Sequence, residues 1–323
     1  MPGVLVFTEV KDGKLKKVSR EALSIGRKLA EAAGGDLVAF ATDAAAAEDA
    51  GKYGAKKLYV ANAGDYATEP YTAALAQVAK DVQPSVMLFG GTSNGRDLAP
   101  RVAARLGVGV ASDVDRLEWT DGKLRARRPV YSGKAFATVE VTGTPAIATT
   151  RPNAFPAEES GGGAAAVVNV TVDAGDARVK LVETKVPEAG ELSIAEADII
   201  VSGGRGLKEA ANFSYIRDLA HAIGGAVGAS RATVDAGWID HQHQVGQTGR
   251  VVSPNLYIAA GDCSGDQECP RFDTIRDDGV LSTVQAIRSL DVDNAAPIPT
   301  DLCTHGPQQI RQVRHFRLAC CIV

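Results

Sequence analysis

Residues 197–212 read ADIIVSGGRGLKEAAN, and this stretch decides how the second half of the chain folds. Asp198 to Ser202 predicts a short buried strand, because Ile199, Ile200 and Val201 form an apolar, β-branched run. A glycine-rich turn at 203–206 follows, and a helical pattern begins after it. Strand, glycine turn and helix in this order predict an anion site, because glycines allow close backbone approach and free N–H groups at a helix start attract phosphate.

Two further loops, 229–232 and 244–250, lie beside two more predicted strands, Ala226–Gly228 and Leu256–Ala260. Loops at the carboxyl ends of parallel strands gather at one crevice. The residues expected to converge there on one ligand are Arg205, Ser230, Arg231, Gln247 and Thr248. Arginines, hydroxyls and glycine N–H groups suit a pyrophosphate. Taken singly, Arg205 also fits a surface charge beside a turn, and Arg231 a salt bridge at a helix start.

The composition of the chain sets wider bounds. At 323 residues it is long enough for two domains, and 45% hydrophobic residues with only 5% aromatics are typical of α/β proteins. A net charge of -4 without blocks of like charge argues against nucleic-acid binding. No apolar run approaches the roughly 20 residues that span a bilayer, and the first residues lack the pattern of a signal peptide. We therefore expect a cytoplasmic protein without membrane insertion.

The first half of the chain predicts an open, doubly wound parallel sheet, since four strand–helix repeats lie between residues 4 and 106. Strand patterns then dominate, and we expect them to form a β-rich appendage of this domain. The expected strands are Asp115–Glu118, Leu124–Val130, Ala135–Val141, Pro145–Thr149, Ala165–Val172 and Val179–Val186. A flexible segment is expected at Glu158–Gly163.

The predicted organisation is therefore α/β, with two nucleotide-binding-like domains. An N-terminal α/β domain spans 1–186, a linker spans 187–195, and a second α/β domain spans 196–261. Residues 262–323 form a divergent tail. His241 and His243 are expected to be exposed loop residues rather than acid–base catalysts.

Several motifs, taken together, resemble one family. GGRGL (203–207), VGASRATVDAGW (227–238) and QVGQTG (244–249) resemble the flavin domain of the electron-transfer flavoprotein alpha subunit. GGTSNGRDLAPRVAARLGVGVASDV (90–114) and TTRPNAFP (149–156) are similar to the N-terminal half of that family. The resemblance covers about residues 1–261, with its motifs in order.

The resemblance implies a heterodimer with a beta subunit, docked through the N-terminal domain, and one FAD held mainly by the C-terminal domain. It implies an electron carrier of fatty acid beta-oxidation, rather than an enzyme with its own substrate. Electrons would come from acyl-CoA or related dehydrogenases and pass singly to a quinone oxidoreductase. It implies FAD contacts at Arg205, Ser230, Val245, Gly246, Gln247 and Thr248, with Arg231 near the isoalloxazine ring. A guanidinium there would favour the reduced, anionic flavin and raise its potential.

The tail departs from the family after Gly261. The chain reads GDCSGDQECPRFDTIRDDGVLSTVQ where the family has a Ser-Gly-Ala-Ile-Gln-His turn, and all five cysteines lie beyond residue 262. Our hypothesis is a shifted reading frame from about residue 262. A zinc site at Cys263 and Cys269 has the wrong spacing, and the CCIV ending that formally fits prenylation matches easily by chance. No metal ligand set and no catalytic residue is expected.

Two alternatives remain open at this stage. The altered tail could leave the FAD site incomplete, which would make the chain a partner-docking subunit that is poor in flavin. An NAD(P)-binding Rossmann enzyme is disfavoured, because neither GGRG (203–206) nor GGAVG (224–228) is the fingerprint GxGxxG. The acidic residue expected about 20 positions after such a fingerprint is missing as well.

Overall fold

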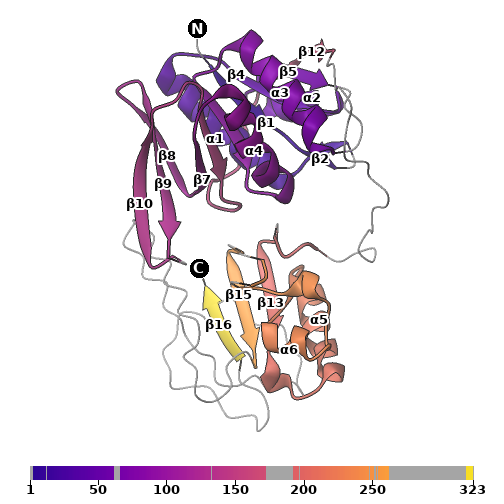
Figure 1. Cartoon of the computed structure of the whole chain (residues 1–323). Coiled ribbons are helices and arrows are strands. Elements are labelled where there is room, and N and C mark those ends of the chain that lie inside the picture. Colours follow the sequence, from indigo (N-terminus) through magenta and orange to yellow (C-terminus); the bar gives the residue numbers. More distant parts are fainter. Residues whose placement is uncertain are drawn as a thin grey trace. The chain divides into compact units, whose positions relative to one another are not determined.

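A computed structural model describes residues 3–11, 13–61, 66–131, 133–171, 192–195, 197–246, 248–250, 252, 254–261 and the backbone of 318–322. The chain divides into two compact units, Met1–Val186 and Pro187–Val323 (Figure 1). Among the described residues, no helix combines the length and the apolar composition needed to cross a bilayer.

The first unit is built on a seven-stranded sheet in which every neighbouring pair is parallel. In spatial order the strands are β12 (Ala166–Val170), β5 (Lys57–Ala61), β4 (Leu37–Ala41), β1 (Val4–Phe7), β6 (Val86–Gly90), β11 (Ala146–Thr150) and β7 (Val110–Val114). A small hairpin pairs β2 (Val10–Lys11) with β3 (Lys14–Leu15). The predicted α/β class with a doubly wound parallel sheet is confirmed.

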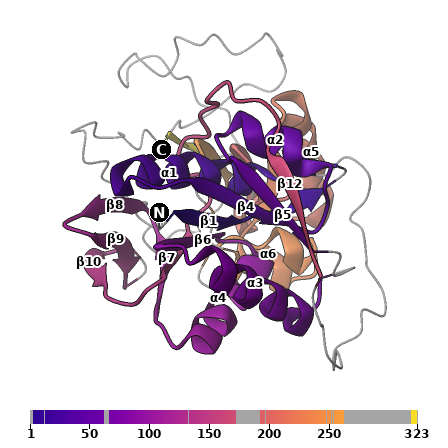
Figure 2. The same cartoon turned by 90° about the horizontal axis from the view of Figure 1, so that it is seen from above.

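Helices cover both faces of this sheet, as the view from above shows (Figure 2). They are α1 (Lys17–Ala33), α2 (Ala46–Lys52), α3 (Thr68–Val82) and α4 (Ser93–Leu106). Alternate residues of a strand point to opposite faces. Val4 and Val6 of β1 therefore pack in one core with α1 and α2, whereas Leu5 and Phe7 pack in the other with α3 and α4.

The expected β-rich appendage is smaller than the sequence indicated. Only β8 (Arg116–Thr120), β9 (Lys123–Val130) and β10 (Ala135–Val141) form a separate antiparallel sheet. The strand expected at Pro145–Thr149 is β11, which lies inside the parallel sheet between β6 and β7, and all five of its residues are buried. The strand expected at Ala165–Val172 is β12, at the far edge of the same sheet. The strand expected at Val179–Val186 lies outside the described residues.

The segment expected to be flexible, Glu158–Gly163, is held against the first unit. The backbone N–H of Glu158 donates to Ser24 Oγ at 2.9 Å, and that of Ser160 donates to the Lys52 carbonyl at 2.7 Å. Lys28 forms an ion pair of 2.9 Å with the Glu158 carboxylate. Its glycines indicated flexibility, but these contacts with distant residues fix its course.

The second unit has a four-stranded sheet in the order β14 (Ala226–Ala229), β13 (Ile199–Gly203), β15 (Leu256–Ala260) and β16 (Leu318–Ile322). The first three strands are parallel, and β16 is antiparallel to β15. The helices are α5 (Phe213–Ala222) and α6 (Arg231–Asp235), with 3-10 turns η1 (Arg205–Leu207), η2 (Ala210–Asn212) and η3 (His241–His243). Phe213, Ile216 and Ala220 of α5 pack on Val201 and Ile258 of the sheet.

The predicted domain boundaries stay predictions. Of the linker expected at 187–195, the structure describes only residues 192–195. Of the tail expected at 262–323, it describes only the backbone of β16.

Candidate functional site at the carboxyl edge of the second sheet

Backbone hydrogen bonds bring the predicted loops of the second unit together at the carboxyl ends of its parallel strands. The N–H of Ser230, just after β14, donates to the carbonyl of Gly203 at the end of β13 at 3.1 Å. The N–H of Val245 donates to the carbonyl of Ala229 at 3.0 Å. The loops 203–206, 229–232 and 244–250 therefore share one edge, which is the place where α/β sheets bind ligands.

The glycine turn after β13 differs from the expectation. The N–H of Gly204 donates to the Ala260 carbonyl at 2.9 Å, and the N–H of Gly206 donates to the Gly261 carbonyl at 2.7 Å. These two groups are already bonded and are not free for phosphate. The turn continues into the 3-10 turn η1, and the α-helix begins at Phe213. The turn instead places the exposed side chain of Arg205 at the edge.

The hydroxyl of Ser230 is available to bond with a ligand atom. Ser230 precedes α6, yet its side chain makes no capping hydrogen bond. Its Oγ is buried and has no hydrogen-bond partner among the described residues. A buried hydroxyl without a partner is costly, and a ligand that offers a polar atom would remove that cost.

Arg231 is the neighbour of Ser230 and lies on the surface. Its Nε is 3.2 Å from Asp235 Oδ2, one helical turn away, and the two side chains are 65% and 63% exposed. Ion pairs this exposed hold a side chain weakly. The guanidinium is therefore available to turn toward an anionic ligand.

The loop 244–250 is a compact ring of hydrogen bonds. The N–H of Gly246 donates to the Arg250 carbonyl at 3.1 Å, and the N–H of Arg250 donates to the Gln244 carbonyl at 2.8 Å. Gly246 has a φ of 123°, in a region that favours glycine. Gln244, only 2% exposed, braces the loop by donating from Nε2 to Thr248 Oγ1 at 2.8 Å.

Of the predicted site residues, the structure describes Arg205, Ser230, Arg231, Val245, Gly246 and Thr248, whereas Gln247 lies outside the described residues. Sequence reasoning missed Gln244. Its place at the start of the glycine-punctuated QVGQTG stretch was the available signal.

The expectation that both histidines are exposed was wrong for one of them. His241 is exposed, but His243 is only 7% exposed. Its Nδ1 lies 3.0 Å from the carbonyl oxygen of Val227 in β14. This contact with a preceding strand explains why a loop histidine is buried.

Within the described ranges, no three His, Cys, Asp or Glu side chains gather in a group that could hold a metal ion. Cys263 and Cys269, weighed above as zinc ligands, lie outside those ranges.

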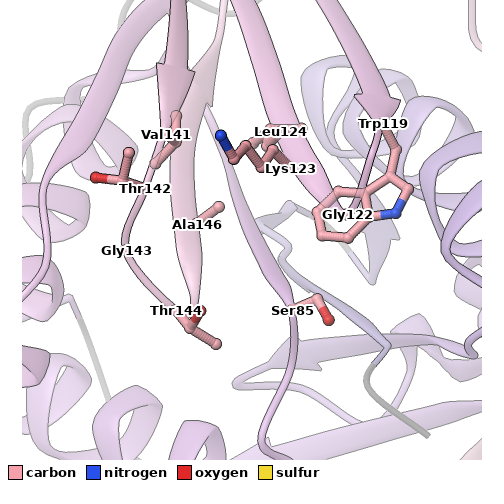
Figure 3. Close-up of a pocket in the computed structure, with 10 residues that line it drawn as sticks. All are labelled: Ser85, Trp119, Gly122, Lys123, Leu124, Val141, Thr142, Gly143, Thr144 and Ala146. Carbon is pink, nitrogen blue, oxygen red and sulfur yellow. The ribbon is translucent and has the colours of Figure 1, made fainter.

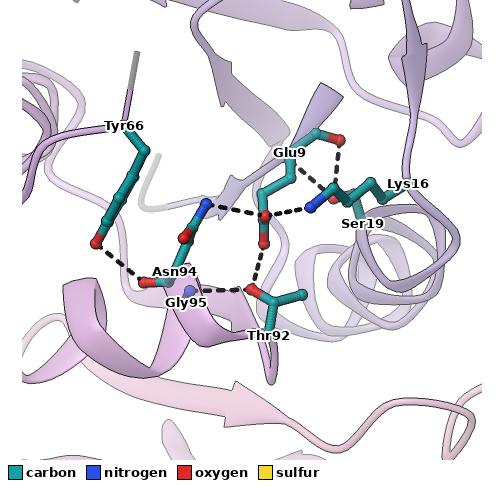
Figure 4. Close-up of polar contacts among 7 residues, drawn as sticks. All are labelled: Glu9, Lys16, Ser19, Tyr66, Thr92, Asn94 and Gly95. Atoms are coloured by element: carbon teal, nitrogen blue, oxygen red, sulfur yellow. Dashed lines mark hydrogen bonds and ion pairs between the residues drawn. The ribbon is translucent and has the colours of Figure 1, made fainter. Parts of the chain in front are cut away.

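The first unit has its own strand switch point, between β1 and β6, and an internal polar network fills it (Figure 4). Glu9 follows β1 and is 8% exposed. Its carboxylate accepts hydrogen bonds from Lys16 Nζ at 2.9 Å, from Asn94 Nδ2 at 3.3 Å and from Thr92 Oγ1. Because its neighbours satisfy this carboxylate, the network holds the ends of β1 and β6 together rather than presenting a ligand group.

A pocket of about 200 Å³ lies elsewhere in the first unit, near the amino ends of β6 and β11 (Figure 3). Trp119, Leu124 and Val141 of the small antiparallel sheet contribute to its lining. The one charged residue that lines it, Lys123, is paired with Glu140 at 3.1 Å. The pocket is thus at the end of the sheet opposite to the carboxyl edge, where ligands of α/β sheets are rarely bound.

Three parallel strands whose carboxyl ends gather two arginines, a glycine loop and a buried hydroxyl without a partner among the described residues are typical of nucleotide-binding α/β domains. Comparison with known proteins narrows this class. The family model described as "Electron transfer flavoprotein domain" matches residues 4–175, and "Electron transfer flavoprotein FAD-binding domain" matches residues 193–268.

Relatives agree with both family models. The electron transfer flavoprotein subunit alpha of Syntrophomonas wolfei is 39% identical over 303 residues, covering 92% of each chain. Protein FixB of Clostridium saccharobutylicum is 39% identical over 269 residues and 80% of each chain. The electron transfer flavoprotein subunit alpha of Bacillus subtilis is 36% identical over 265 residues, covering 80% of this chain and 81% of its own.

The chain belongs to the electron transfer flavoprotein alpha subunit family. The resemblance found in the sequence is thereby confirmed. Membership supports a role in electron transfer with a flavin cofactor, and it implies pairing with a beta subunit and with redox partners.

Proposed function

We propose that this chain holds FAD at the carboxyl edge of its second sheet and acts as an electron carrier in fatty acid beta-oxidation. Electrons arrive from acyl-CoA or related dehydrogenases and leave one at a time to a quinone oxidoreductase. The observation that carries the proposal is the buried Ser230 Oγ, which has no hydrogen-bond partner among the described residues, in a unit that the FAD-binding family model matches. Bound FAD would supply the electron-storing chemistry.

The residues at the edge take distinct parts. Ser230 offers its hydroxyl as a hydrogen-bond partner for the cofactor. Arg205 offers a guanidinium to the phosphates, and Arg231 offers another near the isoalloxazine ring, where a positive charge favours added electrons. Val245, Gly246 and Thr248 line the other side of the site, and Gln247, which lies outside the described residues, is the further FAD contact that the resemblance implies. Since the Gly204 and Gly206 N–H groups are occupied by the carbonyls of Ala260 and Gly261, phosphate binding depends mainly on Arg205 rather than on the glycine turn.

The proposal includes a heterodimer with a beta subunit, docked through the first unit. In the first unit the strand switch point is filled by Glu9 and its neighbours, which leaves cofactor binding to the second unit. We therefore expect one FAD in the alpha subunit.

Co-expression with the beta subunit, followed by visible absorbance spectroscopy, tests this function. The expected result is a yellow heterodimer with an FAD spectrum that bleaches when an acyl-CoA dehydrogenase and its acyl-CoA are added. Reoxidation by a quinone oxidoreductase should then restore the colour. A nicotinamide-dependent activity without flavin would favour a Rossmann enzyme instead.

One observation favours a second candidate, a partner-docking subunit that is poor in flavin. The match to the FAD-binding family model ends at residue 268, although the chain continues to 323. A colourless heterodimer that stays colourless after added FAD would support this alternative.

A further inference from the structure

The strand β14 lies at an edge of the described sheet, and the segment 243–245 covers its open side. Val227 and Ala229 are two positions apart in β14. Their carbonyl groups therefore point to the same side of the strand, away from β13. The Ala229 carbonyl accepts from the backbone N–H of Val245 at 3.0 Å. The Val227 carbonyl, two residues earlier, lies 3.0 Å from a side-chain atom, Nδ1 of His243.

The partners of the His243 ring define its hydrogen-bonding roles. A backbone carbonyl only accepts, so Nδ1 must donate to Val227. The Nε2 atom lies 3.4 Å from the amide nitrogen of Gln242, which donates, so Nε2 accepts. The contact with the Val227 carbonyl therefore places a proton on Nδ1. The ring therefore donates to β14 at the position where a neighbouring strand would donate a backbone N–H.

We propose that His243 is a positioning residue for the flavin site. It sets the register between loop 244–250 and β14, the strand that leads directly into Ser230 and Arg231. The inference rests on the proposed function, because His243 would position Val245, Gly246 and Thr248, the wall of the proposed FAD site. Two hydrogen bonds between described residues tie this segment to β14, His243–Val227 and Val245–Ala229, and the first of them depends on a side chain.

Loss of the His243 bond has two consequences. The Val227 carbonyl would be left without this donor in a buried place, and the segment would lose one of the two hydrogen bonds described above that tie it to β14. Val245, Gly246 and Thr248 would then be held less firmly beside Ser230. Preorganised binding walls bind more tightly because less ordering is needed on binding. We expect weaker FAD binding without any loss of a direct FAD contact.

Three substitutions of His243 separate this role from general damage. Asn carries its amide nitrogen at the position of Nδ1, so His243→Asn keeps a donor for Val227. Gln carries its amide nitrogen one bond farther out, so His243→Gln does not, although it is equally polar. His243→Leu removes the donor entirely. Substitution of the exposed neighbour, His241→Leu, is the matched control.

The experiment uses the full chain co-expressed with its beta subunit, stripped of flavin and titrated with FAD. We expect the dissociation constant for FAD to rise about tenfold in His243→Leu and His243→Gln, and to stay near the parent value in His243→Asn and His241→Leu. The position of the bound-flavin absorbance band should shift in the same two weakened variants, since the loop contacts the cofactor.

The outcomes distinguish the two proposals. If the parent binds FAD and the Asn, Gln and Leu variants bind it equally well or equally poorly, the positioning role is overturned while the proposed function stands. If the parent itself binds no FAD, the proposed function and this inference both fail. Thermal unfolding of each flavin-free variant shows whether a weakened variant is still folded. Among folded variants, the difference in FAD affinity between His243→Asn and His243→Gln shows whether the hydrogen bond to Val227 matters.

Discussion

The backbone N–H of Gly206 donates a hydrogen bond of 2.7 Å to the carbonyl oxygen of Gly261. This bond fastens the turn after β13 to the residue that follows β15. A Cβ on Gly206 would lie 2.7 Å from Gly261 Cα, and one on Gly261 would lie 2.8 Å from the Gly206 backbone. Gly261 also has a φ of 66°, in the left-handed region. Glycine is therefore required at both positions by backbone contact, and not only by the shape of the turn.

Substitution of this glycine contact should destabilise the second unit. Gly206→Ala is expected to lower the free energy of unfolding by about 3 kcal/mol, because backbone must move to admit the Cβ. The comparison is Gly224→Ala, which has a φ of 67° but open space around its Cβ position and should cost only about 1 kcal/mol. Urea unfolding followed by Trp238 fluorescence, in a Trp119→Phe background, measures both. Equal losses would contradict the contact argument.

Ser230→Ala should not lower the stability of the flavin-free chain and should raise it slightly, because the buried Ser230 Oγ has no partner to lose among the described residues and its burial is costly. The same change should weaken FAD binding about tenfold if the hydroxyl bonds to the cofactor. Thr233→Val provides the contrast, since Thr233 Oγ1 donates to the Ser230 carbonyl at 2.8 Å. That variant should lose about 1 kcal/mol of stability even without flavin. Urea unfolding and FAD titration distinguish the two patterns.

Arg231→Ala should lower the flavin midpoint potential without a measurable change in stability. The exposed pair with Asp235 contributes little to folding, so its loss is expected to be silent in urea unfolding. Removing a positive charge near the flavin disfavours added electrons, and a decrease of about 30 mV corresponds to about 1.4 kcal/mol for a two-electron couple. Asp235→Ala, which breaks the same ion pair but keeps the guanidinium, should not lower the potential. Spectroelectrochemical titration of the holo heterodimer measures this, and an equal decrease in both variants would argue against the role of Arg231.

Acid should weaken the first unit through Asp97. The hydroxyl of Thr68 donates to Asp97 Oδ2 at 2.6 Å and, together with the Tyr66 hydroxyl and Arg101, lowers the pKa of this carboxyl below its ordinary 3.8. A lowered pKa means that the folded state favours the ionised form, so this stabilisation is complete at neutral pH. It is lost as the pH falls from about 3.8 through the lower folded value.

Thr68→Val should therefore destabilise the first unit most at pH 7, and its difference from the parent should shrink toward pH 3. Arg101→Gln is the control, because Arg101 contributes least to the lowered pKa of Asp97 and its pair with that residue is largely exposed. Urea midpoints over this pH range, read from Trp119 in a Trp238→Phe background, provide the measurement. A gap between Thr68→Val and the parent that stays constant with pH would show that Thr68 does not act through this carboxyl.

The hypothesis of a shifted reading frame from about residue 262 can be tested on the coding DNA. We expect resequencing to reveal an insertion or deletion near codon 262 whose correction restores a Ser-Gly-Ala-Ile-Gln-His-like turn. The corrected chain should then bind FAD more tightly than the present one. An intact frame, with no compensating change downstream, would remove this hypothesis.

The parallel strands were predictable where burial on both faces produces an uninterrupted apolar run, as in β1, β4 and β6. The edge strand β7, VASDV, was missed because Ser112 and Asp113 interrupt its run. Asp113 is nevertheless accommodated, since its carboxylate lies 2.7 Å from the guanidinium of Arg151 after β11. That partner is distant in sequence and could not be inferred from a local pattern.

By itself, the sequence determined the α/β class of both halves, the three parallel strands of the second unit, and the loops that gather at its carboxyl edge. These follow from apolar periodicity and glycine positions, which are local properties. Only the tertiary structure decided that the Gly204 and Gly206 N–H groups are occupied, that Ser230 Oγ is buried without a partner in the described part of the chain, and that His243 turns inward to Val227. Whether a polar group is satisfied depends on atoms brought near it by the fold, and no local pattern contains that information.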